Sequence, residues 1–459
     1  MLRKRLFTVF LALLLSLALL VPAVSAAAPL PVKNVIFMIG DGMGIGAVQL
    51  ARNALVGPDG RLVMETFPAL GLATTFSADN AVTDSAAAGT ALATGHKTKN
   101  GMVSVLPDGT TPVTTILEAA QKKGLATGLI STNTIYDATP AAFGAHWGTR
   151  GGSAEIAAQL LDHNIDVLLG GGSAYFFPAG VEDGVRKDGR NLATEAQAKG
   201  YAVVRDKDAL AAVGGTKVLG LFHSSYMNYQ KDRAFLGTSE PTLAQMAAKA
   251  LAILSQSKNG FFVMIEGARI DHAAHAADLP GVIAEMKDFN DAVALARDFA
   301  AAHPDTLLVV TADHDTMGLS VTEPLDYALL KQVTVSPEFM AGKLEKDSAG
   351  VFTEGSIRQA FATYAGITDL TPQEVAAVQA QSKYPAYLVG YAIGSIIAAR
   401  AHAGVVDPAV RALGHTGGHT GNMVPVYAMG PGASLFAGVL DNTQIPRRMA
   451  ALLGVNLTE

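Results

Sequence analysis

The sequence predicts an α/β fold with a doubly wound, mostly parallel central sheet flanked by helices. Short, continuous, largely apolar runs are the first evidence, because strands that are buried on both faces have this pattern. Alanine-rich helical stretches alternate with these runs, as expected for a sheet covered on both sides. The predicted strands are Val32–Ile39, Ala126–Ser131, Ile165–Leu169, Phe261–Ile265, Thr306–Val310 and Val424–Met429. The clearest predicted helices are Ser153–Asp162, Thr242–Leu254 and Leu279–Ala302.

The predicted strands also end in, or just before, acidic, histidine or glycine residues. Open α/β sheets bind their ligands at the carboxyl ends of the strands. Oxygen and imidazole side chains collected at such an edge indicate a metal-assisted site. The sequence is therefore interpreted as that of an enzyme.

The first 26 residues have the pattern of a secretory signal peptide. The basic start MLRKR precedes an apolar core from Phe7 to Val21, and VSA is a cleavage site that ends at Ala26. A retained membrane anchor is the alternative interpretation, but the apolar stretch is short for a span. We therefore expect an exported protein, either secreted or periplasmic.

The composition excludes several classes of protein. Of the 459 residues, 49% are hydrophobic and 16% charged, which is typical of a folded globular chain. Removal of the basic leader makes the formal net charge −9 instead of −6, so we expect neither nucleic-acid binding nor stable membrane association after processing. The absence of cysteine excludes thiolate metal sites, a catalytic cysteine and a lipid anchor on cysteine.

One region, from about residue 319 to residue 404, differs from the rest of the chain. It has no apolar run that ends in a set of ligands, and Glu and Lys are scattered through helix-like segments such as TPQEVAAVQAQ. We interpret it as an insertion that decorates the sheet, in the role of a lid or an oligomer contact. Further core helices are the alternative interpretation.

Two motifs near the N-terminus offer an acidic ligand and a nucleophile. Asp41 follows the first predicted strand within IGDGMGIG, where glycines let a ligand approach the backbone, although a glycine-rich turn alone has the same pattern. Ser85 follows Asp84 at the start of an alanine-rich segment that should be helical. Free amides and the helix dipole stabilise an anion there. Helix capping by these two residues is the alternative.

The segment that follows the strand at Ala126 contributes further oxygen ligands and a cation. Asp137 and Thr139 are hard ligands of the kind that magnesium prefers. Arg150 is suited to a bidentate hold on phosphate. Taken alone, the same residues are better explained by an Asx-type turn and a surface arginine.

The segment EGARIDHAAH is a more specific signal. Glu266 lies at the end of a predicted strand, and Asp271 and His275 follow it at a spacing of four residues. On a helix this spacing places both side chains on one face. An oxygen and a nitrogen ligand together suit zinc.

Two later motifs complete the set of candidate ligands. TADHD places Asp313 and His314 after a five-residue apolar run, and GHTGGHTGN places His415 and His419 among glycines just before another strand. Together the motifs supply ligands for two transition-type metal ions and a neighbouring oxygen site. Two such ions can stabilise the attacking and leaving oxygens of a phosphoryl displacement.

In this order the motifs resemble those of the alkaline phosphatase family. The matching segments run from about Val32 to Pro431 and include GDGMG, DSA, DATPAA, EGARIDHAAH, TADH and HTGN followed by GPGA. The resemblance implies that residues 30–459 form a catalytic domain of this family. It further implies hydrolysis of phosphate monoesters through a phosphoserine, with two zinc ions and one magnesium ion per subunit, and a homodimer.

The resemblance also implies a role for each site residue. Ser85 matches the nucleophile, and Arg150 matches the arginine that clamps the substrate phosphate. The ligands of the first zinc are Asp271, His275 and His419, and those of the second are Asp41, Ser85, Asp313 and His314. The magnesium ligands are Asp41, Thr139 and Glu266, with Asp137 contributing through water. His419 is preferred to His415 because its HTG lies at the family spacing from GPGA.

His272 departs from the enterobacterial members of the family, which have a lysine at this position. We expect His272 to contact the substrate phosphate and to affect the third metal site, with cobalt as an alternative to zinc. Phosphodiesterase or sulfatase activity on the same fold is the nearest alternative function. A non-catalytic exported protein that binds phosphate or metal is the alternative from another class.

Overall fold

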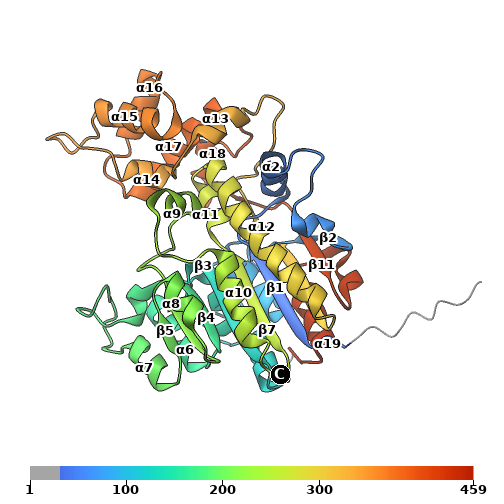
Figure 1. Cartoon of the computed structure of the whole chain (residues 1–459). Helices are drawn as coiled ribbons and strands as arrows, with labels where there is room; N and C mark the ends of the chain where they lie inside the picture. The colour runs from blue at the N-terminus through green and yellow to red at the C-terminus, as the bar shows by residue number, and fades with distance from the viewer. Residues whose placement is uncertain (1–30, 458–459) are drawn as a thin grey trace, which may run out of the picture. The chain divides into compact units, whose positions relative to one another are not determined.

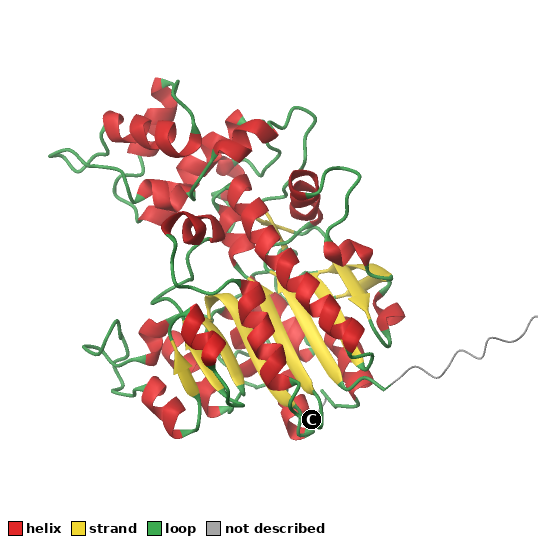
Figure 2. Ribbon diagram, viewed as in Figure 1, coloured by secondary structure: helices red, strands yellow, loops and turns green. Residues whose placement is uncertain are grey.

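A mixed sheet of ten strands forms the centre of the part of the chain that the structure describes, residues 31–457 of a computed structural model (Figure 2). The strand order is β12-β2-β11-β8-β1-β7-β3-β4-β6-β5, and every pairing is parallel except the two made by β11. The strands are β1 Asn34–Gly40, β2 Ala69–Thr74, β3 Ala126–Thr134, β4 Val167–Gly171, β5 Ala202–Val204, β6 Val218–Leu221, β7 Phe261–Gly267, β8 Thr306–Ala312, β11 Val424–Met429 and β12 Gly438–Asp441. A separate two-stranded ribbon consists of β9 Asp315–Thr316 and β10 His419–Thr420.

Helices cover both faces of the sheet. Helices α10 and α12 lie across the near face in Figure 1, while α4, α5 and α19 contact strands β1, β3 and β7. The helices are α2 Ile45–Leu55, α3 Ser85–Thr94, α4 Ile116–Lys122, α5 Ala138–Gly144, α6 Ser153–Asp162, α7 Leu192–Ala198, α8 Lys207–Ala212, α9 Gln230–Leu236, α10 Leu243–Leu254, α11 Arg269–His275, α12 Leu279–Ala302, α13 Tyr327–Gln332, α14 Pro337–Ala341, α15 Glu354–Ala365, α16 Pro372–Gln379, α17 Ala386–Arg400, α18 Pro408–Arg411 and α19 Gln444–Leu453. Short 3₁₀ turns occur at η1 Val63–Thr66, η2 Ser173–Phe176 and η3 Ala433–Phe436.

The α/β fold class predicted from the sequence is confirmed. All six predicted strands occur in the central sheet, and β4 begins two residues later than expected, at Val167. The three predicted helices are α6, α10 and α12. Helix α10 begins one residue after Thr242 because the Thr242 side chain accepts a hydrogen bond from the Gln245 amide as an N-cap. Strands β2, β5, β6 and β12 were not predicted: β5, β6 and β12 have only three or four residues, and β2 contains a glycine and buries only alternate residues.

The three central strands determine where the ligands gather. Strand β1 lies between β7 and β8, and Gly40 pairs with Gly267 on one side and Ala312 on the other. Asp41 and Asp313 follow β1 and β8 directly, so both leave the sheet at the same edge. Because β11 is antiparallel to β8, the chain enters β11 at this edge too. A residue that precedes β11 can therefore meet residues that follow β1 and β8.

The segment that contains α13 to α17 has a hydrophobic cluster separate from the main core. Phe361, Val378 and Ile393 are among the residues buried in this cluster. In Figure 1 these helices lie beyond the strand ends rather than on a face of the sheet. We propose that residues from about 319 to 404 form an inserted region.

The signal peptide predicted for residues 1–26 lies outside the described residues. Within residues 31–457, no helix combines the length and the apolar character that a membrane span requires. Helix α12 is the longest at 24 residues, but it contains charged residues such as Glu285 and Asp288.

The close approach of α17 to α11 predicts a stability defect on substitution of one glycine. Gly394 is buried, and a β-carbon there would lie 1.8 Å from the Ala276 carbonyl oxygen. We expect Gly394→Ala to lower the free energy of unfolding by about 1–3 kcal/mol, because backbone must move to relieve the clash. Thermal and denaturant unfolding measure this change.

Gly355→Ala is the matched control, because it is also a helical glycine but has open space around it. We expect the free energy of unfolding of this variant to be unchanged or slightly higher. Equal effects of the two substitutions would contradict the packing of α17 described above.

Candidate metal centre

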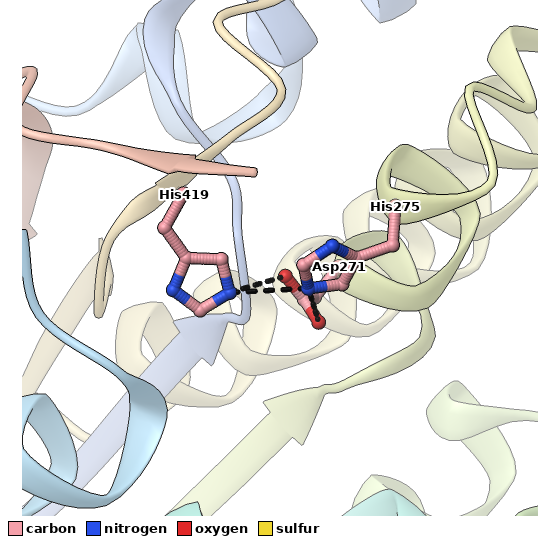
Figure 3. A group of neighbouring side chains, drawn as sticks. All are labelled: Asp271, His275 and His419. Carbon is pink, nitrogen blue, oxygen red and sulfur yellow. Dashed lines mark hydrogen bonds and ion pairs between the residues drawn. The ribbon is translucent and has the colours of Figure 1, made fainter. Parts of the chain in front are cut away.

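A first group of three ligand side chains lies at the carboxyl edge of the sheet. Asp271 and His275 come from α11, and His419 comes from β10 (Figure 3). Their ligand atoms lie within 4.8 Å of one another, and the Nε2 atom of His275 is 3.2 Å from Asp271 Oδ2 and 3.1 Å from His419 Nε2. The four-residue spacing in α11 places Asp271 and His275 on one face, as the sequence predicted.

The hydrogen bonds of these two imidazoles leave both Nε2 atoms free to bind a cation. His275 Nδ1 donates to the carbonyl oxygen of Gly417 at 2.8 Å, and His419 Nδ1 donates to that of Thr83 at 2.9 Å. A carbonyl oxygen can only accept, so each Nδ1 carries the hydrogen. In the neutral rings both Nε2 lone pairs then face each other and the Asp271 carboxylate. Such an arrangement is repulsive unless a proton or a metal cation lies among the three.

The ribbon of β9 and β10 brings the second histidine pair together. His419 pairs with Thr316 in the ribbon, and this register stacks the His419 ring on that of His314, with centroids 3.6 Å apart. The two histidines are more than 100 residues apart in sequence. The ribbon therefore links the two groups of ligands.

A second group surrounds His314. Its Nε2 atom lies 3.2 Å from Ser85 Oγ, 3.2 Å from Asp313 Oδ2 and 3.5 Å from Asp41 Oδ1. Thr316 Oγ1 donates to Asp271 Oδ1 at 2.5 Å and accepts from His314 Nδ1 at 3.2 Å. The hydrogen of His314 therefore lies on Nδ1, and Nε2 is directed at the acids and the serine.

Asp271 belongs to both groups. Among residues 31–457, two sets of three acidic or histidine side chains bring their ligand atoms within 4.8 Å of one another: Asp271, His275 and His419, and Asp41, Asp271 and His314. The sequence assigned Asp271 to one metal ion only. The geometry places its carboxylate between the two groups, where it can act on both.

Buried oxygens without hydrogen-bond partners give a second reason to expect cations. Asp41 Oδ1, Asp313 Oδ2 and Thr139 Oγ1 have no donor among the described residues. Burial and the neighbouring carboxylates raise the pKa of Asp41 well above its usual range, and burial raises the pKa of Asp313 to about 7. An unpaired buried carboxylate is costly, and a bound divalent cation would offset that cost. The donor set therefore fits metal ions.

The candidate magnesium ligands lie beside the second group. Glu266 is buried in β7 and accepts a hydrogen bond from Ser131 Oγ at 2.5 Å, while burial raises its pKa to about 8. Thr139 is buried in α5. Asp137 precedes α5 without capping it, and accepts from Asn133 Nδ2 at 2.8 Å. The Asx-type turn considered for Asp137 therefore does not explain its side chain.

Ser85 and Arg150 occupy the side of the site suited to phosphate. Ser85 is the first residue of α3, and Asp84 is the N-cap that accepts from the Ala87 amide. The capping role considered for this pair thus belongs to Asp84 alone. Arg150 donates to Asp84 Oδ2 at 3.2 Å and to Asp137 Oδ2 at 3.3 Å. These carboxylates hold the guanidinium close to the start of α3.

His272 is held by Arg269, which was not predicted from the sequence. Arg269 NH1 donates to His272 Nδ1 at 2.6 Å, and its guanidinium lies 3.6 Å from the centroid of the Tyr229 ring. Burial and the Arg269 charge lower the pKa of His272 to about 3, so the ring is neutral with its hydrogen on Nε2. The three-residue spacing of Arg269 and His272 on a helix was the signal that could have identified this contact.

The structure places His419, and not His415, in a ligand group. His415 is exposed, and no metal-ligand group among the described residues contains it. Thr316 and Ser131, which bond to Asp271 and Glu266, were also not predicted. Hydroxyl side chains are too common in sequences to identify them by pattern.

The sheet edge gathers buried carboxylates, imidazoles and a serine, which together define a metal-dependent hydrolase of the α/β class. The chain belongs to the alkaline phosphatase family, because the sequence model of that family matches residues 32–455. It is 38% identical to alkaline phosphatase 3 of Bacillus subtilis (strain 168), over 93% of this chain and 90% of that protein. The protein is therefore a phosphatase.

Solved structures agree with this assignment. The alkaline phosphatase of Thermus thermophilus has a TM-score of 0.83 and 29% identity, over 96% of each chain. A variant of the TAB5 alkaline phosphatase, solved with Mg bound in its M3 site, has a TM-score of 0.66 and 26% identity over 94% of this chain and 100% of that chain.

The raised carboxyl pKa values predict how the metal-free protein responds to pH. A buried acid with a raised pKa stabilises the fold when protonated, and this stability is lost as pH rises through the folded-state pKa. The pKa of Glu266 is raised from 4.5 to about 8 and that of Asp313 from 3.8 to about 7, so the loss is complete near pH 8 and is clearest between about pH 6.5 and pH 8. We expect the melting temperature of chelator-treated protein to fall across this range, as measured by calorimetry.

His314 and His419 do not oppose this fall in melting temperature with rising pH. Burial lowers the pKa of His419 to about 4 and that of His314 well below its usual range, so both are neutral in the folded state, and above about pH 6.5 they are mostly neutral in the unfolded state too. The metal-loaded protein is the control, and its melting temperature should change much less because bound cations keep the carboxylates charged. A metal-free melting temperature that rises between about pH 6.5 and pH 8 would contradict the electrostatic argument.

Proposed function

We propose that this protein is an exported alkaline phosphatase that hydrolyses phosphate monoesters through a phosphoserine formed on Ser85. The position of Ser85 is the observation that carries the proposal. Its Oγ lies 3.2 Å from His314 Nε2, in the second ligand group and at the first position of α3. A nucleophile in this position is activated by nearby positive charge and faces free helix amides that bind an anion.

We propose two zinc ions and one magnesium ion as cofactors, with cobalt as an alternative to zinc. Asp271, His275 and His419 would hold the first zinc, and Asp41, Ser85, Asp313 and His314 the second. Asp41, Thr139 and Glu266 would hold magnesium, with Asp137 acting through water. Imidazole with carboxylate suits zinc, and a set made only of oxygen suits magnesium, which is also the ion in the TAB5 variant. When bound, the ions would stabilise negative charge on the attacking and leaving oxygens.

The residues of the chain hold the phosphate for in-line attack. Arg150, fixed by Asp84 and Asp137, offers two parallel donors to the non-bridging oxygens. The amides at the start of α3 supply further donors. The Nε2–H of His272 can donate to the same phosphate, because Arg269 occupies its Nδ1. Donors that are already in place need little reorganisation during the reaction.

The reaction then has two displacements. Ser85 Oγ gives its proton to solvent and attacks phosphorus, the bond from phosphorus to the ester oxygen breaks, and the alcohol leaves with a proton from solvent. Water then attacks the phosphoserine and gives up a proton, the bond from phosphorus to Oγ breaks, phosphate is released, and Oγ takes up a proton. In each step the developing charge lies beside Arg150 and the α3 amides.

Export and assembly complete the proposal. The pattern of residues 1–26 supports cleavage of a signal peptide and a secreted or periplasmic location. The resemblance to the family supports a homodimer.

Substitution of the nucleophile tests the proposed function. We expect Ser85→Ala to abolish labelled phosphoenzyme in acid-quenched reactions and to lower kcat/KM for a nitrophenyl phosphate monoester by several orders of magnitude. Ser77→Ala is the control, because Ser77 is buried but bonds to Asp79 outside the site. Full turnover by Ser85→Ala, or a faster reaction of the wild type with the matching diester, would contradict the proposal.

Separate substitutions of His419 and His415, which lie four residues apart in the sequence, test the first zinc site. We expect His419→Ala to bind about one zinc ion per chain fewer than the wild type at low free zinc, because three-ligand sites depend on each ligand. Elemental analysis after equilibrium dialysis measures this difference. His415→Ala should bind as much zinc as the wild type, because His415 is exposed. Equal zinc loss in both variants would be evidence against the assignment of His419.

A further inference from the structure

A groove in the segment formed by α16 to α18 lies next to the first ligand group. Its volume is about 630 Å³, and its lining includes Tyr384, Leu388, Tyr391, Ile396, Pro408 and Arg411. Most of these side chains are apolar or aromatic. Arg411 is the positively charged residue among the lining residues. The groove therefore has the mixture of apolar wall and few polar groups that is typical of a small-molecule site.

Two lining residues also contact His275. Arg411 NH1 donates to the His275 carbonyl oxygen at 2.8 Å. The Tyr391 ring is nearly parallel to that of His275, with centroids 6.4 Å apart, and the Arg411 guanidinium lies 4.9 Å from the Tyr391 ring centroid. A β-carbon at Gly418 would be only 3.3 Å from Arg411 Cγ, so this glycine leaves room for the arginine stem. One wall of the groove thus packs directly against a proposed metal ligand.

Arg411 has no carboxylate partner within ion-pair distance among residues 31–457. Other arginines of helices α15 to α17 are paired with carboxylates. Arg400 contacts Glu374 and Asp369, and Arg358 contacts Glu354. Glu374 also lines the groove, but its charge is balanced by Arg400 at 2.7 Å. The groove therefore carries one uncompensated positive charge, on Arg411, and its complement is an anion.

The reaction geometry directs the alcohol part of the substrate toward this side. Ser85 lies in the second ligand group, beside His314. In-line displacement places the leaving oxygen opposite the attacking one, which is toward the first group and His275. The groups attached to the leaving oxygen then extend toward the residues that surround His275, among which are Tyr391 and Arg411.

We infer that this groove is a subsite for the alcohol part of the substrate, and that it favours monoesters whose alcohol carries a second anionic group, a carboxylate or a further phosphate, bound by Arg411. The inference rests on the proposed function, since it assigns a substrate class to the same site. Tyr391 would form the apolar surface along which the carbon chain lies. The Arg411 hydrogen bond to His275 would keep the guanidinium oriented while its other N–H groups bind the anion.

Matched pairs of esters test the subsite. Glycerol 3-phosphate has a terminal hydroxymethyl group where 3-phosphoglycerate has a carboxylate. Sorbitol 6-phosphate and 6-phosphogluconate repeat this difference on a longer carbon chain. The measured quantity is the preference, which is kcat/KM for the anionic ester divided by kcat/KM for its neutral partner. We expect the wild type to prefer the anionic member of at least one pair. In Arg411→Gln we expect this preference to fall about tenfold, as for the loss of one charge-assisted contact.

Three further variants separate binding from structure. Arg358→Gln removes a positive charge from the same segment away from the groove, so the preference should not change. Arg411→Lys keeps the charge and should keep most of the preference. Ala377→Glu adds a carboxylate at an exposed position of the groove wall without disturbing Arg411, and should also lower the preference. If Arg411→Gln fails to fold, Ala377→Glu still tests the subsite.

The outcomes are distinguishable. Equal preference in the wild type, Arg411→Gln and Ala377→Glu would overturn the subsite while the phosphatase assignment stands. A parallel loss of kcat/KM for both members of every pair in Arg411→Gln would assign Arg411 a structural role and also overturn the subsite. A metal-loaded wild type without turnover of any monoester would overturn the proposed function and the subsite together.

Discussion

The concentration of buried negative charge around Asp271 is the constraint on which the rest of the structure depends. Asp271 lies within 4.8 Å of ligands in both groups, and Asp41 and Asp313 reach the same place from neighbouring strands. Several of the carboxylate oxygens have no hydrogen-bond donor. Carboxylates can be buried together in this way only if cations neutralise them or if protons remain bound. The sheet brings these acids together, and the stability of the fold is therefore coupled to the cations or protons that neutralise them.

The imidazoles are oriented by groups outside the ligand set. His275, His419 and His314 each have their Nδ1 hydrogen bonded to an oxygen of the chain, so each presents Nε2 to the centre. The acceptors lie in three different segments, at Gly417, Thr83 and Thr316. Such bonds fix the tautomer and the ring plane before any ion binds. The hydrogen bonds from His314 to Thr316 and from Thr316 to Asp271 also connect the two ligand groups. A shift in the side chains of one group therefore alters the other group.

Helices α14 to α17 form their own buried cluster, and this segment together with α18 contacts residues at the edge of the site. Glu338 lies 3.6 Å from Arg269, which holds His272, and Arg411 is bonded to His275. The segment can therefore affect how the alcohol part of a substrate binds, although it supplies no metal ligand. A rigid sheet that carries the chemistry and an adjoining segment that contacts the substrate would allow specificity to change while the metal centre is kept.

The sequence by itself determined the elements whose signals are local. Apolar runs identified the six strands that carry or flank the site, and the four-residue spacing placed Asp271 and His275 on one helical face, because neighbouring residues alone decide such periodicities. Only the tertiary structure decided the rest. The antiparallel direction of β11, the place of Asp271 between both groups, and the roles of Thr316 and Arg411 all depend on partners far away in the chain. The physical reason is that hydrogen bonds and charges act across space, whereas a sequence pattern records only the spacing along the backbone.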